Sequence, residues 1–274
     1  MTASIEPFFL PSYAGNIFCV YFPPNTVMDT GKDVLFFPPF AEELNKSRRM
    51  VSLQARALSR LGYGVLIPDL YGTGGSEGDF ADGEWELWLH DLETAQKWLT
   101  SRGRGQVIYW GMRLGALLAL DAISRWRVVP LKIVLWQAVV SGETYLTHFL
   151  RLRLAADMMT SGGAWTIEGM RVALSDGNQV EVAGYILNPN LATSIDKLSL
   201  AVFRPPADVN VEWMEVVSAP DRSISHAGRQ IVDRWRQDTG AIKISTVVGE
   251  VFWNTPEISQ LPNLIDITVQ RVIA

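Results

Sequence analysis

The segment Gly111 to Gly115, centred on Arg113, has the clearest chemical consequence in this sequence. It reads Gly-Met-Arg-Leu-Gly, follows the apolar run 107–110 and precedes the helical run 116–120. A strand, a sharp turn and a helix in this order expose the central side chain at the helix N-terminus, where many hydrolytic enzymes carry a nucleophilic serine. The guanidinium group of Arg113 stays protonated and cannot attack a carbonyl group. The segment therefore predicts the geometry of a nucleophile without the nucleophile.

A serine on such a turn works with an acid and a histidine that follow it along the chain in that order. Asp221 follows the predicted strand 213–217, where the acid belongs, and Glu250 follows the last predicted strand, 244–248, where the histidine belongs. None of the three histidines of the chain follows that last strand. Because an enclosed guanidinium group is costly unless it is paired, we expect an Arg113–Glu250 ion pair in place of the serine–histidine contact.

The loop after the third predicted strand would supply a backbone N–H group to a ligand oxygen. Pro38 and Pro39 have no N–H group, so the candidates begin at Phe40. Acidic residues at 42–43 and basic residues at 46–49 also fit the start of a helix, with acids early and bases late. We expect a small ligand to contact this loop, the residue before the central arginine and a tryptophan after the last strand. These binding residues are Phe40, Ala41, Glu42, Glu43, Met112 and Trp253.

Apolar strand runs alternate with helical runs along the chain. Strands are predicted at 5–10, 17–21, 34–37, 63–68, 107–110, 133–136, 213–217 and 244–248, with the first two forming an antiparallel hairpin. Helices are predicted at 53–61, 84–100 and 145–159. This pattern predicts an α/β fold with a mostly parallel central sheet and helices on both faces. Ligands then bind at the carboxyl ends of the strands.

Residues 142–200 interrupt this alternation. They contain the predicted helix 145–159 and one short alternating run, 180–185, after the turn Asp-Gly-Asn at 176–178. No long Gly/Ser linker flanks them, so we expect a cap inserted after the sixth strand rather than a tethered domain. The core would comprise residues 1–141 and 201–274.

Two levels of resemblance can be stated from sequence motifs. The strand and glycine-rich loop at 62–76 resemble the segment that precedes the nucleophile in α/β-hydrolases. The runs 37–50, 110–118, 135–137, 139–143, 149–153, 182–185 and 252–257 resemble the exosortase A system-associated hydrolase 2 family, and this resemblance covers nearly the whole chain. It implies an α/β-hydrolase fold in a cytoplasmic protein from bacterial loci that make exopolysaccharide and sort PEP-CTERM-tagged proteins. It implies no known substrate.

Composition excludes several classes of function. The formal net charge is -5, and the basic residues are scattered, which argues against nucleic acid as the main partner. The single cysteine, Cys19, excludes an internal disulfide, and no Cys/His spacing indicates a metal site, so we expect neither a metal nor a cofactor. We expect Cys19 to be a small buried residue. No signal peptide and no apolar run of membrane-spanning length are present, so a cytoplasmic location is expected.

Three functions stay open. The first is a pseudoenzyme that binds an anionic acyl or glycan-precursor ligand through Arg113 and the N-terminus of the following helix. The second is an atypical hydrolase, in which Glu250, Asp221 or Glu42 activates water while the arginine stabilises negative charge. The third is a non-catalytic partner of another enzyme of the same pathway, and a homodimer is equally open. Ordinary serine ester hydrolysis is disfavoured, and we favour the first function.

Overall fold

The protein is built around one central β-sheet. The computed structural model describes residues 5–126, 128–160, 165–237 and 241–274. The strands of the sheet are β1 (Glu6–Pro11), β2 (Asn16–Phe22), β3 (Lys32–Phe37), β4 (Gly64–Pro68), β5 (Gln106–Met112), β6 (Lys132–Trp136), β9 (Asn210–Val217) and β10 (Ile242–Val248). Their order across the sheet is β1-β2-β4-β3-β5-β6-β9-β10. The pairs β1–β2 and β2–β4 are antiparallel, and every other pair is parallel. The predicted opening hairpin and mostly parallel sheet are confirmed.

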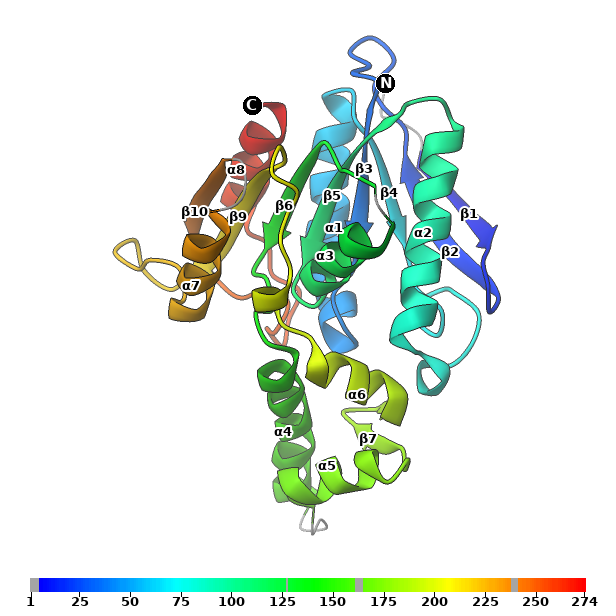
Figure 1. The fold of residues 1–274 in the computed structure, drawn as a ribbon, viewed down its shortest axis with the longest axis vertical. Helices are drawn as coiled ribbons and strands as arrows, with labels where there is room; N and C mark the ends of the chain where they lie inside the picture. The colour runs from blue at the N-terminus through cyan, green and yellow to red at the C-terminus, as the bar shows by residue number, and fades with distance from the viewer. Residues whose placement is uncertain (1–4, 127, 161–164, 238–240) are drawn as a thin grey trace.

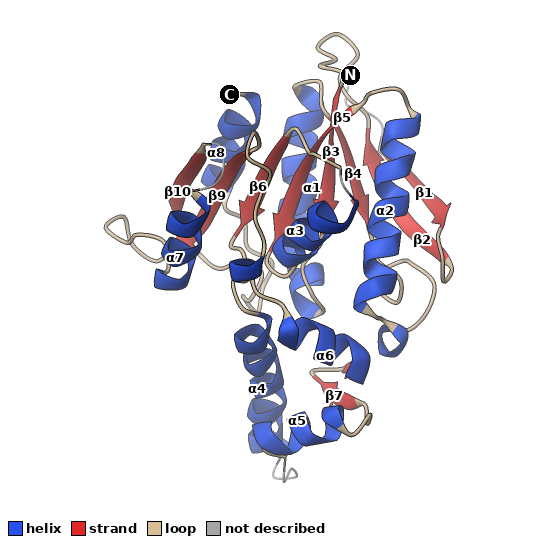
Figure 2. Ribbon diagram, in the orientation of Figure 1, coloured by secondary structure: helices blue, strands red, loops and turns tan. Residues whose placement is uncertain are grey.

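Helices cover both faces of this sheet (Figures 1 and 2). One face carries α2 (Trp85–Ser101), α3 (Gly115–Trp126) and α7 (His226–Trp235), and the other carries α1 (Glu42–Arg60) and α8 (Pro262–Ile273). Successive side chains of a strand point to opposite faces of the sheet, so each strand contributes side chains to two hydrophobic cores. In β3, for example, Leu35 and Phe37 join the core under α2 and α3, whereas Val34 and Phe36 join the core under α1 and α8. The predicted fold class is confirmed.

The helix α1 is longer than the predicted helix at 53–61, because it begins at Glu42. Its first turn is acidic, and Lys46 pairs with Glu42 at 2.9 Å one turn later. This charged half lacks the apolar periodicity on which the prediction depended. It is nevertheless anchored, because Leu44 and Met50 are buried against the sheet. The alternative interpretation of the charged run as a helix start is therefore confirmed.

Residues 142–200, here named the cap segment, lie between β6 and β9 in the chain. They form α4 (Gly142–Thr160), α5 (Ile167–Ser175), β7 (Val180–Val182), β8 (Tyr185–Leu187) and α6 (Pro189–Lys197), followed by the short helix η2 (Leu200–Val202). Residues 161–164 lie outside the described part. Figure 1 shows the segment at the lower end of the molecule, beyond the carboxyl ends of the parallel strands. Its independence as a cap, with a core of 1–141 and 201–274, stays a prediction.

The predicted single strand at 180–185 is wrong in detail. The structure has two short antiparallel strands, β7 and β8, that pair from Val180 to Leu187. Ala183 and Gly184 join them with φ angles of 52° and 83°. Two consecutive residues of positive φ make the tight turn that suits a two-residue hairpin. Apolar and polar residues alternate without a break through this turn, so the sequence pattern did not indicate that the strand ends there.

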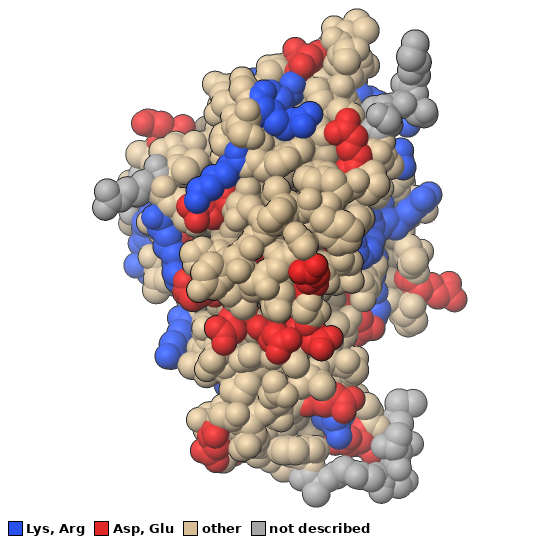
Figure 3. Space-filling view, turned by 90° about the vertical axis from the view of Figure 1, so that its right-hand side faces the viewer, with Lys and Arg blue, Asp and Glu red and all other residues tan. Residues whose placement is uncertain are grey.

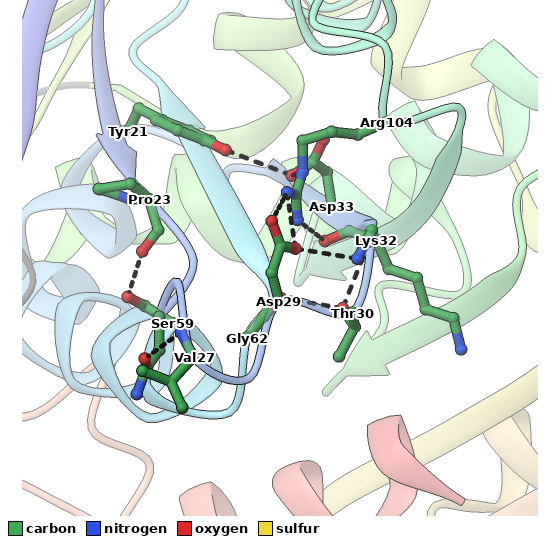
Figure 4. Close-up of polar contacts among 12 residues, drawn as sticks. Tyr21, Pro23, Val27, Asp29, Thr30, Lys32, Asp33, Ser59, Gly62 and Arg104 are labelled. Carbon is green, nitrogen blue, oxygen red and sulfur yellow. Dashed lines mark hydrogen bonds and ion pairs between the residues drawn. The ribbon is translucent and has the colours of Figure 1, made fainter.

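A partly buried arginine, Arg104, fixes the loop before β3 at the amino ends of the strands (Figure 4). Arg104 donates to Asp33 at 2.8 Å, to both carboxylate oxygens of Asp29 at 2.7 Å and to the carbonyl oxygen of Lys32 at 3.0 Å. Burial raises the pKa of Asp33, and Arg104 partly offsets that rise. The hydroxyl group of Tyr21 also donates to Asp33, at 3.4 Å. This cluster lies at the amino ends of the central strands β3 and β5, at the end of the sheet opposite the cap segment, where it holds the adjoining loops in place.

The surface and interior agree with several expectations from composition. On the face in Figure 3, acidic side chains form a band across the lower middle, and that face carries no broad basic surface. Cys19 is completely buried, as predicted, and burial raises the pKa of its thiol to about 12. No helix within the described ranges is long and apolar enough to cross a membrane.

Candidate functional site

The turn between β5 and α3 has the sharp geometry that the sequence predicts. Arg113 has φ of 55°, a left-handed conformation that costs a residue with a side chain roughly 1–2 kcal/mol. Its N–H donates to the carbonyl oxygen of Trp136 at 2.9 Å, which fixes the turn over β6. Gly115 permits the turn, because a Cβ atom there would lie 2.0 Å from the carbonyl oxygen of Phe37. The loop after β3 and the turn that carries Arg113 are therefore in direct contact.

The side chain of Arg113 forms an ion pair with Glu43, in the first turn of α1. Its Nε and Nη2 atoms donate to Oε1 of Glu43 at 3.1 and 2.9 Å, and its Nη1 donates to the carbonyl oxygen of Gln137 at 3.3 Å. The other carboxylate oxygen, Oε2, accepts a hydrogen bond from the Tyr145 hydroxyl group at 2.9 Å. The arginine and glutamate side chains are 19% and 17% exposed. The pair is thus mostly withdrawn from water.

Two aromatic rings enclose this ion pair. The Cζ atom of Arg113 lies 5.6 Å from the ring centre of Tyr145 and 5.3 Å from that of Trp253, within cation–π range. Burial alone would lower the pKa of Arg113, but Glu43, with smaller contributions from Tyr145 and Glu215, more than offsets this and raises it. Burial, reinforced by Glu43, raises the pKa of Tyr145 well above its ordinary value. The arginine is therefore a permanent cation, and the tyrosine stays a neutral hydrogen-bond donor.

The predicted Arg113–Glu250 ion pair is wrong. Glu250 is exposed and forms no ion pair within the described part of the chain. From the same loop, Trp253 reaches the guanidinium group instead. The first turn of α1 already supplies a carboxylate to Arg113, and position along the sequence could not reveal this packing. Asp221 is also exposed, and its side chain forms no hydrogen bond with a described residue.

A cavity of about 180 Å³ adjoins the ion pair. Its lining comes from the start of α1 and the loop before it, the turn at Arg113, one face of α4 and the loop after β10: Phe40, Glu42, Glu43, Arg113, Tyr145, His148, Phe149, Leu152, Trp253 and Asn254. The structure thus brings four of the six expected binding residues to the cavity. Ala41 lies between two of them in the chain, whereas Met112 is fully buried in the core under α1 and α8 and does not line it.

The contribution of α4 was missed by sequence reasoning. Tyr145, His148, Phe149 and Leu152 recur at the i, i+3, i+4 and i+7 spacing of one helix face. The helix itself was predicted, so this spacing was a usable signal. Nothing in the sequence indicated which segments of the core this helix face would contact.

Two backbone N–H groups at the site have no partner in the described part of the chain. Those of Ala41, which precedes α1, and of Leu114, which follows Arg113, donate to no group among the described residues. Both residues are buried, and Ala41 has an unusual backbone conformation, with φ of 50° and ψ of -123°. Buried N–H groups are nearly always paired. Together with the N-terminus of α3, they can bind an oxygen atom of a ligand, preferably an anionic one.

A second carboxylate lies nearby, within β9. Glu215 is buried and accepts hydrogen bonds from the Trp213 indole at 2.9 Å and from the Ser225 backbone N–H at 2.8 Å and hydroxyl group at 3.1 Å. It fixes the loop before α7, and its charge contributes to the raised pKa of Arg113. A charged residue inside an apolar strand run was the sequence signal that could have indicated this buried carboxylate. In the part of the chain that is described, no cluster of three or more His, Cys, Asp or Glu side chains could hold a metal ion.

Comparisons with known proteins identify the fold. No protein-family model matches the sequence, and no curated protein matches it significantly. Solved structures do match over almost their full length. Est1E from Butyrivibrio proteoclasticus, bound to ferulic acid, has a TM-score of 0.68 at 12% identity over 97% of this chain and 98% of its own. An α/β serine hydrolase without a lid from Xanthomonas campestris has a TM-score of 0.59 at 15% identity over 99% and 96%. Mouse α/β hydrolase domain-containing protein 10 has a TM-score of 0.57 at 12% identity over 98% of each chain. The chain has the α/β-hydrolase fold.

Proposed function

We propose that this chain is a non-catalytic α/β-hydrolase-fold protein that binds a small acyl or glycan-precursor ligand through an anionic group at Arg113. The observation that carries the proposal is the arrangement at the turn after β5. A strained backbone presents a permanent cation to a cavity, beside two buried N–H groups without partners in the described chain. Strain of this kind persists where the surrounding structure enforces it, and it is most common at functional sites.

The contacts of the carboxylates argue against hydrolysis by an activated water. Asp221 and Glu250 are exposed and make no contact with Arg113. Glu42 lines the cavity but pairs with Lys46 at 2.9 Å. Glu43 accepts hydrogen bonds on both oxygens, which leaves it poorly placed to take a proton from water. The atypical hydrolase is therefore the weaker interpretation.

The family resemblance suggests the biological context of this binding site. The proposal extends to a bacterial, cytoplasmic protein of exopolysaccharide and PEP-CTERM loci, in which residues 142–200 act as a cap over the ligand. The aromatic and polar lining of the cavity supports the binding of a small ligand beneath this cap. Phe40, Tyr145, Phe149 and Trp253 offer apolar faces, while His148 and Asn254 add polar groups. Binding sites for small ligands commonly combine such walls with a few polar groups.

Calorimetric titration of the purified protein with inorganic phosphate, acetate, a sugar phosphate and an acyl phosphate tests the proposal. We expect at least one anion to bind, and Arg113→Met to weaken binding about tenfold or more, because a charge-assisted hydrogen bond is lost. Arg125→Met is the matched control, since Arg125 pairs with Glu86 on α2, outside the cavity. Equal binding by Arg113→Met, or ester turnover by the unmodified protein, would overturn the proposal.

A further inference from the structure

The first turn of α1 contacts both the turn at Arg113 and the cap segment. Glu43 receives the guanidinium group on Oε1 and the hydroxyl group of Tyr145, from α4, on Oε2. Two residues later, Asn45 donates to the hydroxyl oxygen of Tyr185, from β8, at 3.1 Å. One carboxylate thus links the ligand-binding cation to the first helix of the cap segment.

Glu43 occupies the position that an anionic ligand requires. Both Nε and Nη2 of Arg113 point to the same oxygen of Glu43, so a carboxylate or phosphate at those donors would lie against that oxygen. Glu42 adds a second negative group to the cavity wall, and Lys46 already pairs with it. Like charges in a site withdrawn from water repel strongly. An anion can therefore bind at this edge of the guanidinium group only if the Glu43 carboxylate moves away.

Displacement of Glu43 also removes the partner of Tyr145. The hydroxyl group of this buried tyrosine has no acceptor among the described residues other than Oε2 of Glu43, and a buried donor without a partner destabilises the packing around it. The opposite side of the cap segment keeps separate contacts with the core, from Asn188 to the carbonyl oxygen of Ala81 at 2.9 Å and from Asn190 to Glu84 at 3.0 Å. The loss would therefore act at the α4 side.

We propose that Glu43 controls anion binding at this site: it competes with the anionic group of the ligand for Arg113, and its displacement releases Tyr145 and loosens α4. The inference rests on the proposed function, because it requires an anion to bind at Arg113. Beyond that function, Glu43 is the residue that competes with the anion, and α4 is the helix that responds to its displacement.

Titration with inorganic phosphate, combined with hydrogen exchange of the α4 amides, tests this inference on the intact protein. We expect Glu43→Gln to bind phosphate about tenfold more tightly than the unmodified protein, because the competing charge is gone. Phosphate should accelerate exchange in α4 of the unmodified protein. In Tyr145→Phe, which keeps the Arg113–Glu43 pair, α4 should exchange faster without phosphate, and phosphate should accelerate it little further.

Glu42→Gln is the matched control, because it removes the same charge from the same cavity without touching Arg113 or Tyr145. We expect it to change phosphate affinity about threefold or less, as for an exposed ion pair. Equal gains in Glu42→Gln and Glu43→Gln, or unchanged α4 exchange when phosphate binds, would overturn the inference and leave the proposed function standing. Failure of every anion to bind either protein would overturn both. Circular dichroism and a urea transition confirm that each variant is folded.

Discussion

Arg113 and Glu43 lie 70 residues apart in the sequence, and their side chains meet with 2.9 Å between Nη2 and Oε1. The turn after β5 brings the cation, and the first turn of α1 brings the carboxylate. The charge of the arginine is thus balanced from the amino end of a helix, and neither Asp221 nor Glu250 takes part. This pairing makes the site a mostly buried ionic contact that lines one wall of the cavity.

Removing the charge of one partner of this pair should reduce the free energy of unfolding more than removing both charges. Arg113→Met leaves the Glu43 carboxylate without its cation in a mostly buried setting, so we expect a loss of about 2–4 kcal/mol in the free energy of unfolding. The double variant Arg113→Met/Glu43→Gln should recover a large part of this loss. Urea unfolding of the four proteins gives the coupling energy directly. Strictly additive effects would show that the two side chains do not stabilise each other.

The partly buried Arg104, at the opposite end of the central strands, should be equally important for stability. Arg104→Met leaves Asp33, which is 1% exposed, without its cation, and we expect a loss of about 3 kcal/mol in the free energy of unfolding. Arg236→Met is a suitable comparison, because that arginine and its partner Asp233 are 45% and 57% exposed, so the change should cost about 1 kcal/mol or less. Both values come from urea transitions. Similar losses for the two variants would contradict the structural role of Arg104.

The fold could be predicted from the sequence because its strongest signals are local. Continuous apolar runs such as Val134 to Trp136, alternating with helical runs, specify buried parallel strands with covered faces. For the same reason, the polar half of α1 was predicted only as an alternative, and the turn at Ala183 was missed. Charged residues on an exposed helix face carry no apolar period, and alternation continues unchanged through a tight turn.

The site was predictable only in part. The conformation at Arg113 follows from its glycine neighbours, which are visible in the sequence, and the structure confirms the sharp turn. The partner of Arg113 was assigned wrongly, because the choice among Glu43, Asp221 and Glu250 depends on how distant segments pack. Trp253 was expected at the site and lies there, whereas the α4 face that begins with Tyr145 could not be assigned to any neighbour.

The buried carboxylate of Glu212 should make stability depend on pH. Among the described residues neither of its oxygens has a hydrogen-bond partner, although Nε of Arg271 lies 3.6 Å from Oε2. Burial raises the pKa of Glu212 above 4.5, and Lys132, Arg271 and Lys243 partly offset that rise. The folded protein therefore keeps this proton at pH values where the unfolded chain has lost it, so the group destabilises the fold as pH rises above 4.5. Glu212→Gln removes this dependence. Urea unfolding between pH 4 and 7.5 should show the variant gaining stability relative to the unmodified protein as pH increases, whereas a constant difference would contradict the assignment.

Restoring the serine should not restore hydrolysis. Arg113→Ser places a hydroxyl group on the turn, but the loop after β10 presents Trp253 instead of a histidine to that position. Without a base to remove its proton, the hydroxyl group is a weak nucleophile. We expect no turnover of p-nitrophenyl acetate above the buffer rate and no acyl-enzyme burst. His148 lines the cavity from α4 and is the one histidine that could substitute, so the double variant Arg113→Ser/His148→Ala is the control. A burst in Arg113→Ser that disappears in the double variant would contradict this prediction and assign the base to His148.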